Sequence, residues 1–162
     1  MYLIQSMIFM SSKIILDSSV LIEYAKNSRP ELFEALLIQE KLNLCYGLPI
    51  VSEYLFHYLA IAGNKSPLTL KMNNQIGNIL SVGHPMDIFR PLSFLSDSVE
   101  MVEEAFYLMQ QYNLLSNDAL ILALCKQHDV KYLASFDADF VTACVGEGIR
   151  LVQSAKDCST LD

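Results

Sequence analysis

Short apolar runs alternate with helix-like segments along the whole chain, and this alternation limits the possible folds more than any other feature. Runs such as 13–17 (KIILD) and 42–46 (LNLCY) have the length and composition of buried strands. Longer segments between them carry apolar residues at helical spacing. Strands that alternate with helices form a mainly parallel sheet with helices on both faces. We therefore expect one α/β domain with three layers, α/β/α.

The same pattern predicts the individual elements. Strands are expected over 13–17, 42–46, 88–91, 131–135 and 150–153. Helices are expected over 18–26, 31–39, 47–61, 67–80, 97–112 and 117–128. Asp97 and Glu100 resemble a capping pair, and Ser116 can cap the last helix. The helix that starts near Asp97 has apolar residues at helical spacing that indicate its core face: Val99, Val102, Phe106 and Met109.

The length of 162 residues fits one core. We divide the chain into an N-terminal extension (1–12), a domain (13–153) and a C-terminal tail (154–162). The first ten residues are apolar but too short to span a bilayer, which takes about 20 residues, and no cleavage site of a secretory leader follows them. The four cysteines are widely spaced, which predicts reduced thiols in a cytoplasmic protein rather than a disulfide framework or a zinc site.

The charge balance limits how such a protein could bind nucleic acid. The formal net charge is −7, and the 11 Lys and Arg residues form no run. Proteins that grip long nucleic acids usually present a basic face. Any contact with nucleic acid must therefore be local or mediated by bound cations.

Four acids occupy positions that are awkward for a purely structural role. Asp17 ends an apolar strand, Glu53 lies within an apolar helix, Asp118 opens the buried helix, and Asp137 follows the strand that ends at Ser135. Ligands of parallel sheets bind beyond the carboxyl ends of the strands, where Asp17 and Asp137 are expected. Unpaired carboxylates that converge are best explained by a hard cation such as Mg²⁺ or Mn²⁺.

Each acid also has a structural explanation when it is taken alone. The negative charge of Asp118 could stabilise its helix by interacting with the positive N-terminal end of the helix dipole. Asp17 could cap a helix, and Glu53 could face solvent. Asp137 and Asp139 could be turn residues. The metal-site hypothesis therefore depends on the combination of the four acids and on their order along the chain.

Four motifs in this order resemble the PIN-domain family, especially the toxin-type members of toxin–antitoxin pairs. An apolar strand ends in Asp and hydroxyl residues (IILDSSVLI), and a helical Glu follows (VSEYL). A helix then opens with Asp-Ala (NDALILAL), and a strand leads into an Asp-x-Asp-Phe turn (YLASFDADF). The last two motifs together are quite specific, and the resemblance covers residues 13 to 153.

The resemblance implies roles for individual residues. Asp17, Glu53, Asp118 and Asp137 would hold the metal and carry catalysis, with Asp139 as a candidate fifth ligand. Two hydroxyl residues would support the site, Ser18 by orienting it and Ser135 in the place where the family often has Thr. Asn117 neighbours the site and could also be no more than a helix-start residue.

The resemblance also implies an activity and partners. The expected reaction is Mg²⁺- or Mn²⁺-dependent hydrolysis of RNA that leaves 5′-phosphate and 3′-hydroxyl ends. The implied partners are a second copy of the chain, in a homodimer, and an antitoxin protein, although a stand-alone PIN protein fits the sequence equally well. No membrane would be involved.

Other classes of function remain open at this stage. The acidic balance would suit a catalytically silent PIN fold that serves as an RNA-binding or assembly scaffold. A phosphatase with Asp17 as nucleophile would typically need a second acid where this chain has Ser19. A nucleotide-binding module is disfavoured because no phosphate-binding glycine loop occurs.

Overall fold

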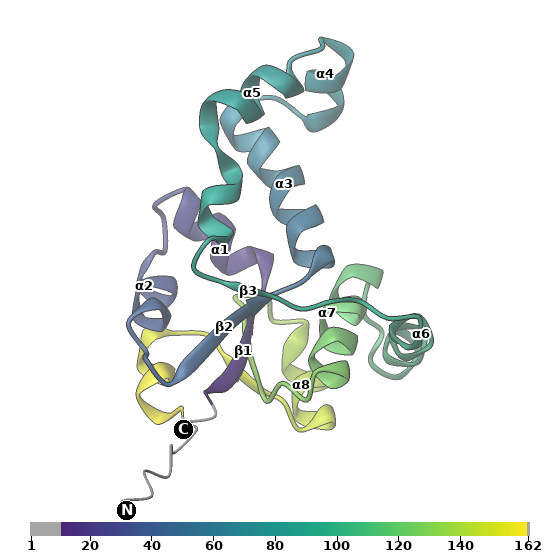
Figure 1. Cartoon of the computed structure of the whole chain (residues 1–162). Coiled ribbons are helices and arrows are strands. Elements are labelled where there is room, and N and C mark those ends of the chain that lie inside the picture. The colour runs from purple at the N-terminus through teal and green to yellow at the C-terminus, as the bar shows by residue number, and fades with distance from the viewer. Residues whose placement is uncertain (1–10, 162) are drawn as a thin grey trace, which may run out of the picture.

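A computed structural model describes residues 11–161 and contains one five-stranded sheet (Figure 1). All neighbouring strands are parallel, in the order β3-β2-β1-β4-β5. The strands are β1 (Ser12–Leu16), β2 (Leu42–Tyr46), β3 (Ser93–Phe94), β4 (Tyr132–Ala134) and β5 (Arg150–Val152). The predicted α/β class with a parallel sheet is confirmed.

Helices cover both faces of this sheet. In Figure 1, α1 and α2 lie on one side, and α6, α7 and α8 lie on the other. The helices are α1 (Ser18–Ala25), α2 (Glu31–Leu37), α3 (Leu48–Gly63), α4 (Pro67–Met72), α5 (Ile76–Gly83), α6 (Glu100–Tyr112), α7 (Ser116–Gln127) and α8 (Phe140–Glu147). Together, α3, α4 and α5 form an arm that extends away from the sheet (Figure 1).

The central strand β1 organises the core. Ile14, Ile15 and Leu16 are fully buried, as expected for a strand covered on both faces. Ile15 pairs with Cys45 of β2 on one side and with Leu133 of β4 on the other. The chain moves outward from β1 to β2 and β3, then returns to place β4 on the other side of β1. This reversal puts a topological switch point between the ends of β1 and β4, where parallel sheets bind ligands.

The buried helix α7 has the central position that its apolar run predicts. Six of its side chains are buried: Ala119, Ile121, Leu122, Ala123, Leu124 and Cys125. Gly47, between β2 and α3, lies so close to Leu124 that a Cβ atom there would clash with its side chain. The glycine therefore lets the start of α3 approach α7, which brings Glu53 and Asp118 toward the same place.

Two predicted elements are wrong. The helix expected over 67–80 is interrupted, because Asn74 adopts a left-handed conformation (φ 54°) between α4 and α5. The strand expected over 88–91 is largely replaced by a 3₁₀ helix, η1 (Pro85–Phe89), which buries Phe89 in the core. The edge strand β3 comes only afterwards.

The predicted core face of α6 is also wrong. Met101, Ala105 and Leu108 are buried, whereas Val99 is 81% exposed and Phe106 is 63% exposed. Of the predicted face, Met109 alone packs against the core, where it is partly buried. Apolar residues recur at helical spacing on both of these faces, so periodicity alone could not choose between them. The predicted caps are absent as well, since the residues before α6 and α7 make no side-chain capping bond.

The C-terminal segment expected as a tail contains a second 3₁₀ helix, η2 (Ala155–Thr160), which contacts α2. Cys158 is buried, and Arg150 Nη1 donates to the Thr160 carbonyl oxygen at 2.8 Å. Of the expected extension, residues 1–10 lie outside the described part of the chain. The division into extension, domain and tail stays a prediction. None of the described helices has the length and apolar character that a membrane crossing requires.

Candidate active site

The loops that follow β1 and β4 meet at the switch point of the sheet. Asp17 is the first residue after β1, and its backbone N–H donates to the Ala134 carbonyl oxygen at the end of β4 (2.9 Å). Asp17 is only 3% exposed, although its side chain ends in a carboxyl group. A carboxylate in such a position needs hydrogen bonds or a cation.

Serine hydroxyls bind one oxygen of Asp17. Ser19 Oγ donates to Asp17 Oδ2 at 2.6 Å, and Ser135 Oγ donates to the same oxygen at 2.7 Å. The other oxygen, Oδ1, accepts only a long bond of 3.4 Å from Ser18 Oγ among the described residues. Oδ2 is thus held by hydrogen bonds within the protein, and Oδ1 is the oxygen that is available to bind a cation.

The same two hydroxyls also fix the loop after β4. Ser19 Oγ accepts from the Phe136 backbone N–H at 3.0 Å, and Ser135 Oγ accepts from the Asp137 backbone N–H at 3.0 Å. Sequence reasoning selected Ser18 and Ser135 as supporting residues and missed Ser19. A hydroxyl two residues after a strand-end Asp was the only available signal.

Glu53 comes to the site from the second turn of α3. Its side chain is 34% exposed and lies 4.0 Å from His57 Nε2. Asn117, at the start of α7, donates its amide N–H to Glu53 Oε2 in a short hydrogen bond. Asn117 is therefore more than a helix-start residue, because its side chain links Glu53 of α3 to the start of α7, where Asp118 follows it.

The remaining acids form a tight group. Asp118, Asp137 and Asp139 each offer a carboxylate oxygen, and these three oxygens lie within 4.8 Å of one another. The Asp139 backbone N–H donates to Asp137 Oδ1 at 2.8 Å, which holds the turn in shape. Oxygen ligands at this spacing suit Mg²⁺ or Mn²⁺.

One cavity of about 340 Å³ connects the four predicted acids. Its lining residues are Asp17, Ser18, Ser19, Ile22, Glu23, Lys26, Glu53, His57, Asp118 and Asp137. We call this cavity the acid pocket. Asp139 lies beside it through its closeness to Asp118 and Asp137. Residues that are far apart in sequence thus bring their carboxylates to one place.

The closely spaced carboxylates of the acid pocket affect the pKa of Asp118. Burial raises the pKa of Asp118 to about 6, and repulsion from Asp137, Asp17, Glu53 and Asp139 adds to the rise. A divalent cation would relieve this repulsion. The side chains fit Mg²⁺ or Mn²⁺ better than zinc, because the ligands are oxygens and all four cysteines are buried and free.

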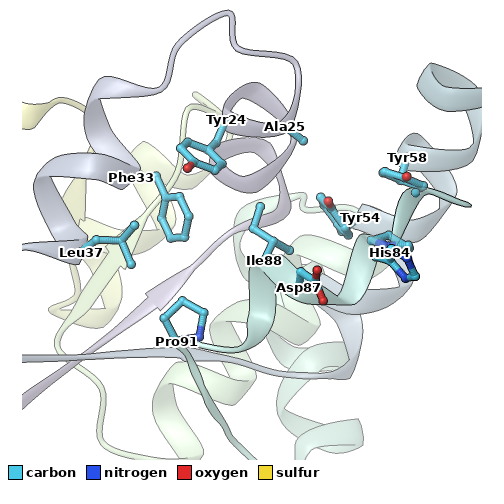
Figure 2. A pocket seen from close by; sticks show the side chains of 12 residues that line it. Tyr24, Ala25, Phe33, Leu37, Tyr54, Tyr58, His84, Asp87, Ile88 and Pro91 are labelled. Atoms are coloured by element: carbon cyan, nitrogen blue, oxygen red, sulfur yellow. The ribbon is translucent and has the colours of Figure 1, made fainter.

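A larger cavity of about 420 Å³ is lined by residues of α1, α2, α3 and η1 (Figure 2). Its walls are mainly aromatic and aliphatic side chains, including Tyr24, Phe33, Tyr54 and Ile88. Asp87 is the only acid among its lining residues. Size alone would favour this cavity, but the acid pocket is the one whose convergent carboxylates could hold a divalent cation.

Comparisons with known proteins find matches that cover most of the chain. A family model described as PIN domain matches residues 14–145. A protein named ribonuclease VapC2, from Methanocaldococcus jannaschii, is 32% identical over 133 residues, with coverage of 80% of this chain and 87% of that protein.

Solved structures share the fold. PAE2754 from Pyrobaculum aerophilum has a TM-score of 0.59 at 12% identity, and the match covers 94% of this chain and 98% of that one. A toxin-antitoxin complex from Klebsiella pneumoniae has a chain with a TM-score of 0.55 at 21% identity, covering 86% of this chain and 96% of that one.

Proposed function

Because the chain belongs to the PIN domain family, we propose that it is a metal-dependent endoribonuclease that uses Mg²⁺ or Mn²⁺ in the acid pocket. The observation that carries this proposal is the shared cavity of Asp17, Glu53, Asp118 and Asp137. The relative from M. jannaschii is named a ribonuclease, which supports RNA as the substrate class.

The residues of the acid pocket would have different roles in the reaction. Asp17 Oδ1, Asp118 and Asp137 would hold the cation, with Asp139 close enough to join them. Asn117 would orient the Glu53 carboxylate through its bond to Oε2. When bound, the cation would lower the pKa of a water ligand and offset charge on the phosphoryl oxygens. The expected products carry 5′-phosphate and 3′-hydroxyl ends.

The proposal also includes two protein partners. One solved neighbour is a toxin-antitoxin complex, which supports an antitoxin for this chain. An inhibitor that inserted a basic side chain among the acids would satisfy their charge and should displace bound Mn²⁺. The second partner is another copy of the chain, since α6 leaves Val102 and Phe106 exposed. The buried, free cysteines fit a cytoplasmic protein.

The test is cleavage of a structured RNA with Mn²⁺ by the wild type and by the Asp17→Asn variant. We expect Asp17→Asn to lower kcat/KM by at least about 100-fold, because a ligand of the cation is lost. The matched control is Asp129→Asn, which changes an exposed acid outside the acid pocket and should keep full activity.

Isothermal titration with Mn²⁺ gives a second, independent measurement. The Asp17→Asn variant should bind Mn²⁺ more weakly than the wild type, whereas Asp129→Asn should not. Equal cleavage by wild type and Asp17→Asn would rule out the assigned site. RNA binding without any cleavage by the wild type would instead indicate the silent scaffold.

A further inference from the structure

A short basic loop, residues 26–29, follows α1 at the rim of the acid pocket, and its backbone is held firmly. The Ser28 and Arg29 backbone N–H groups both donate to the Glu23 carbonyl oxygen, at 3.1 and 3.4 Å. Asn27 adopts a left-handed conformation (φ 54°), which Asn tolerates better than most residues. The loop therefore has a defined shape before any ligand binds.

The side chain of Glu23 is already occupied by this loop. Lys26 Nζ donates to Glu23 Oε1 at 2.7 Å, and Ser28 Oγ donates to Oε2 in a short hydrogen bond. Glu23 and Lys26 both line the acid pocket. Glu23 is therefore a structural acid, and it holds the lysine at the edge of the cavity.

Arg29 lies flat against an aromatic ring beside the site. Its guanidinium carbon is 3.6 Å from the ring centroid of Phe136, a cation–π contact. Phe136 lies between Ser135 and Asp137, and the Ser19 hydroxyl holds its backbone. The stack therefore fixes the guanidinium next to the loop that carries Asp137.

The stacked guanidinium keeps its donors free. Within residues 11–161, the structure assigns no ion pair and no side-chain hydrogen bond to Arg29. Two other basic side chains are occupied, in contrast: Lys126 contacts Glu104 and Glu147, and Arg90 contacts Asp87. Stacking uses the flat face of a guanidinium and leaves its N–H edge for a planar fork of acceptors, a geometry that phosphate provides.

We propose that the loop 26–29 is an RNA phosphate-binding subsite, with Arg29 on the Phe136 ring as its principal ligand and Lys26 beside it. This rests on the proposed nuclease function. A phosphate next to the scissile one would otherwise face carboxylates, and Lys26 is the only Lys or Arg that lines the acid pocket. A chain with a net charge of −7 needs such a local contact.

The experiment compares Arg29→Met, which keeps length but loses charge, with Arg29→Lys, which keeps charge but loses the planar fork. The control is Lys41→Met, which removes an exposed positive charge at the residue before β2, the opposite edge of the sheet. Binding of a fluorescein-labelled single-stranded RNA is followed by anisotropy with Ca²⁺ in place of Mn²⁺. Cleavage with Mn²⁺ gives kcat and KM separately.

We expect Arg29→Met to weaken RNA binding about tenfold and to raise KM with little change in kcat, because the contact lies outside the reacting centre. The slope of log Kd against log salt should fall by about 0.7, the value for one phosphate contact on a single strand. Arg29→Lys should fall between wild type and Arg29→Met. Phe136→Leu should also give an intermediate affinity, because it removes the ring that holds Arg29. Mn²⁺ affinity should stay the same in all of these variants.

An Arg29→Met variant that matched Lys41→Met in Kd and in salt slope would overturn this proposal while leaving the nuclease intact. Unchanged RNA affinity together with weaker binding of an acidic peptide would assign the loop to a protein partner and would also overturn it. A wild type that neither bound nor cleaved RNA would overturn the nuclease function and the subsite together.

Discussion

At the scale of single residues, Asp17 shows how a buried charge is made tolerable. Its Oδ2 atom accepts bonds from two serine hydroxyls that belong to different strand ends. The hydroxyls of Ser19 and Ser135 also lie 3.3 Å apart, so the three side chains form one connected group. Hydrogen bonds to a charged acceptor are stronger than neutral ones, so this group both holds the charge and ties β1 to β4.

The two neighbouring serines after Asp17 should therefore differ in importance. Ser19→Ala removes a bond to Asp17 and leaves the Phe136 N–H without its acceptor, and should lower the free energy of unfolding by about 1–3 kcal/mol. Ser18→Ala is the matched control, since its hydroxyl makes only a 3.4 Å contact, and should cost less. Urea unfolding of the metal-free proteins measures both. Equal losses would contradict the assigned hydrogen bonds.

The raised pKa of Asp118 predicts how the stability of the protein depends on pH. The folded protein holds a proton on Asp118 up to about pH 6, whereas an unfolded Asp releases it near 3.8. The folded state therefore binds more protons between these values, and stability falls as pH rises through them. Above pH 6 Asp118 is charged in both the folded and the unfolded state, so the metal-free protein has lost all of this stability.

Asp118→Asn should remove this loss of stability. In EDTA at pH 7.5 we expect the variant to be more stable than wild type by about 1 kcal/mol, a reduced figure because the group is only partly buried and is screened by water. Near pH 4 the gain should vanish. Adding Mn²⁺ should then stabilise the wild type more than the variant. Thermal unfolding at both pH values checks this, and a variant less stable than wild type at pH 7.5 would contradict it.

At the scale of elements, the strands were easier to predict than the orientation of the helices. Apolar runs that end in an acid locate β1 and its pocket-facing end, because parallel strands share one functional edge. The orientation of α6 depends on its packing against α7, which the local sequence does not encode. The breaks around Asn74 and η1 likewise depend on the arm formed by α3, α4 and α5.

The same limit applies to the acid pocket. The positions of Asp17, Glu53, Asp118 and Asp137 and their order along the chain predict them as a group, and these four line one cavity. The bond from Asn117 to Glu53 joins residues 64 positions apart, so no local pattern could reveal it. Side-chain contacts between residues that are distant in sequence can be identified only when the fold is known.

At the scale of the whole molecule, the exposed face of α6 bears on the proposed homodimer. Val102 and Phe106 are exposed, and Val102 lines a cavity of about 350 Å³ with Leu48 and Leu120. Contiguous apolar surface of this kind is unusual on a monomer and often marks an interface.

Phe106→Glu should therefore separate the two copies without unfolding either. Phe106 is 63% exposed, so the change should alter the stability of the single chain by no more than about 0.5 kcal/mol. Light scattering should give twice the chain mass of 18.2 kDa for wild type and the single mass for the variant. Lys65→Glu, which places the same charge on the arm, is the control. A dimeric Phe106→Glu protein would exclude this face as the interface.

The placement of β4 beside β1 also has a consequence for the order of synthesis. Asp17 is synthesised 118 positions before its hydrogen-bond partner Ser135, and its neighbour Asp137 follows later still. A growing chain folds from its N-terminal end and lacks this half of the cavity until residues 135–137 have left the ribosome. The acid pocket is therefore incomplete during synthesis until the ends of both β1 and β4 have emerged.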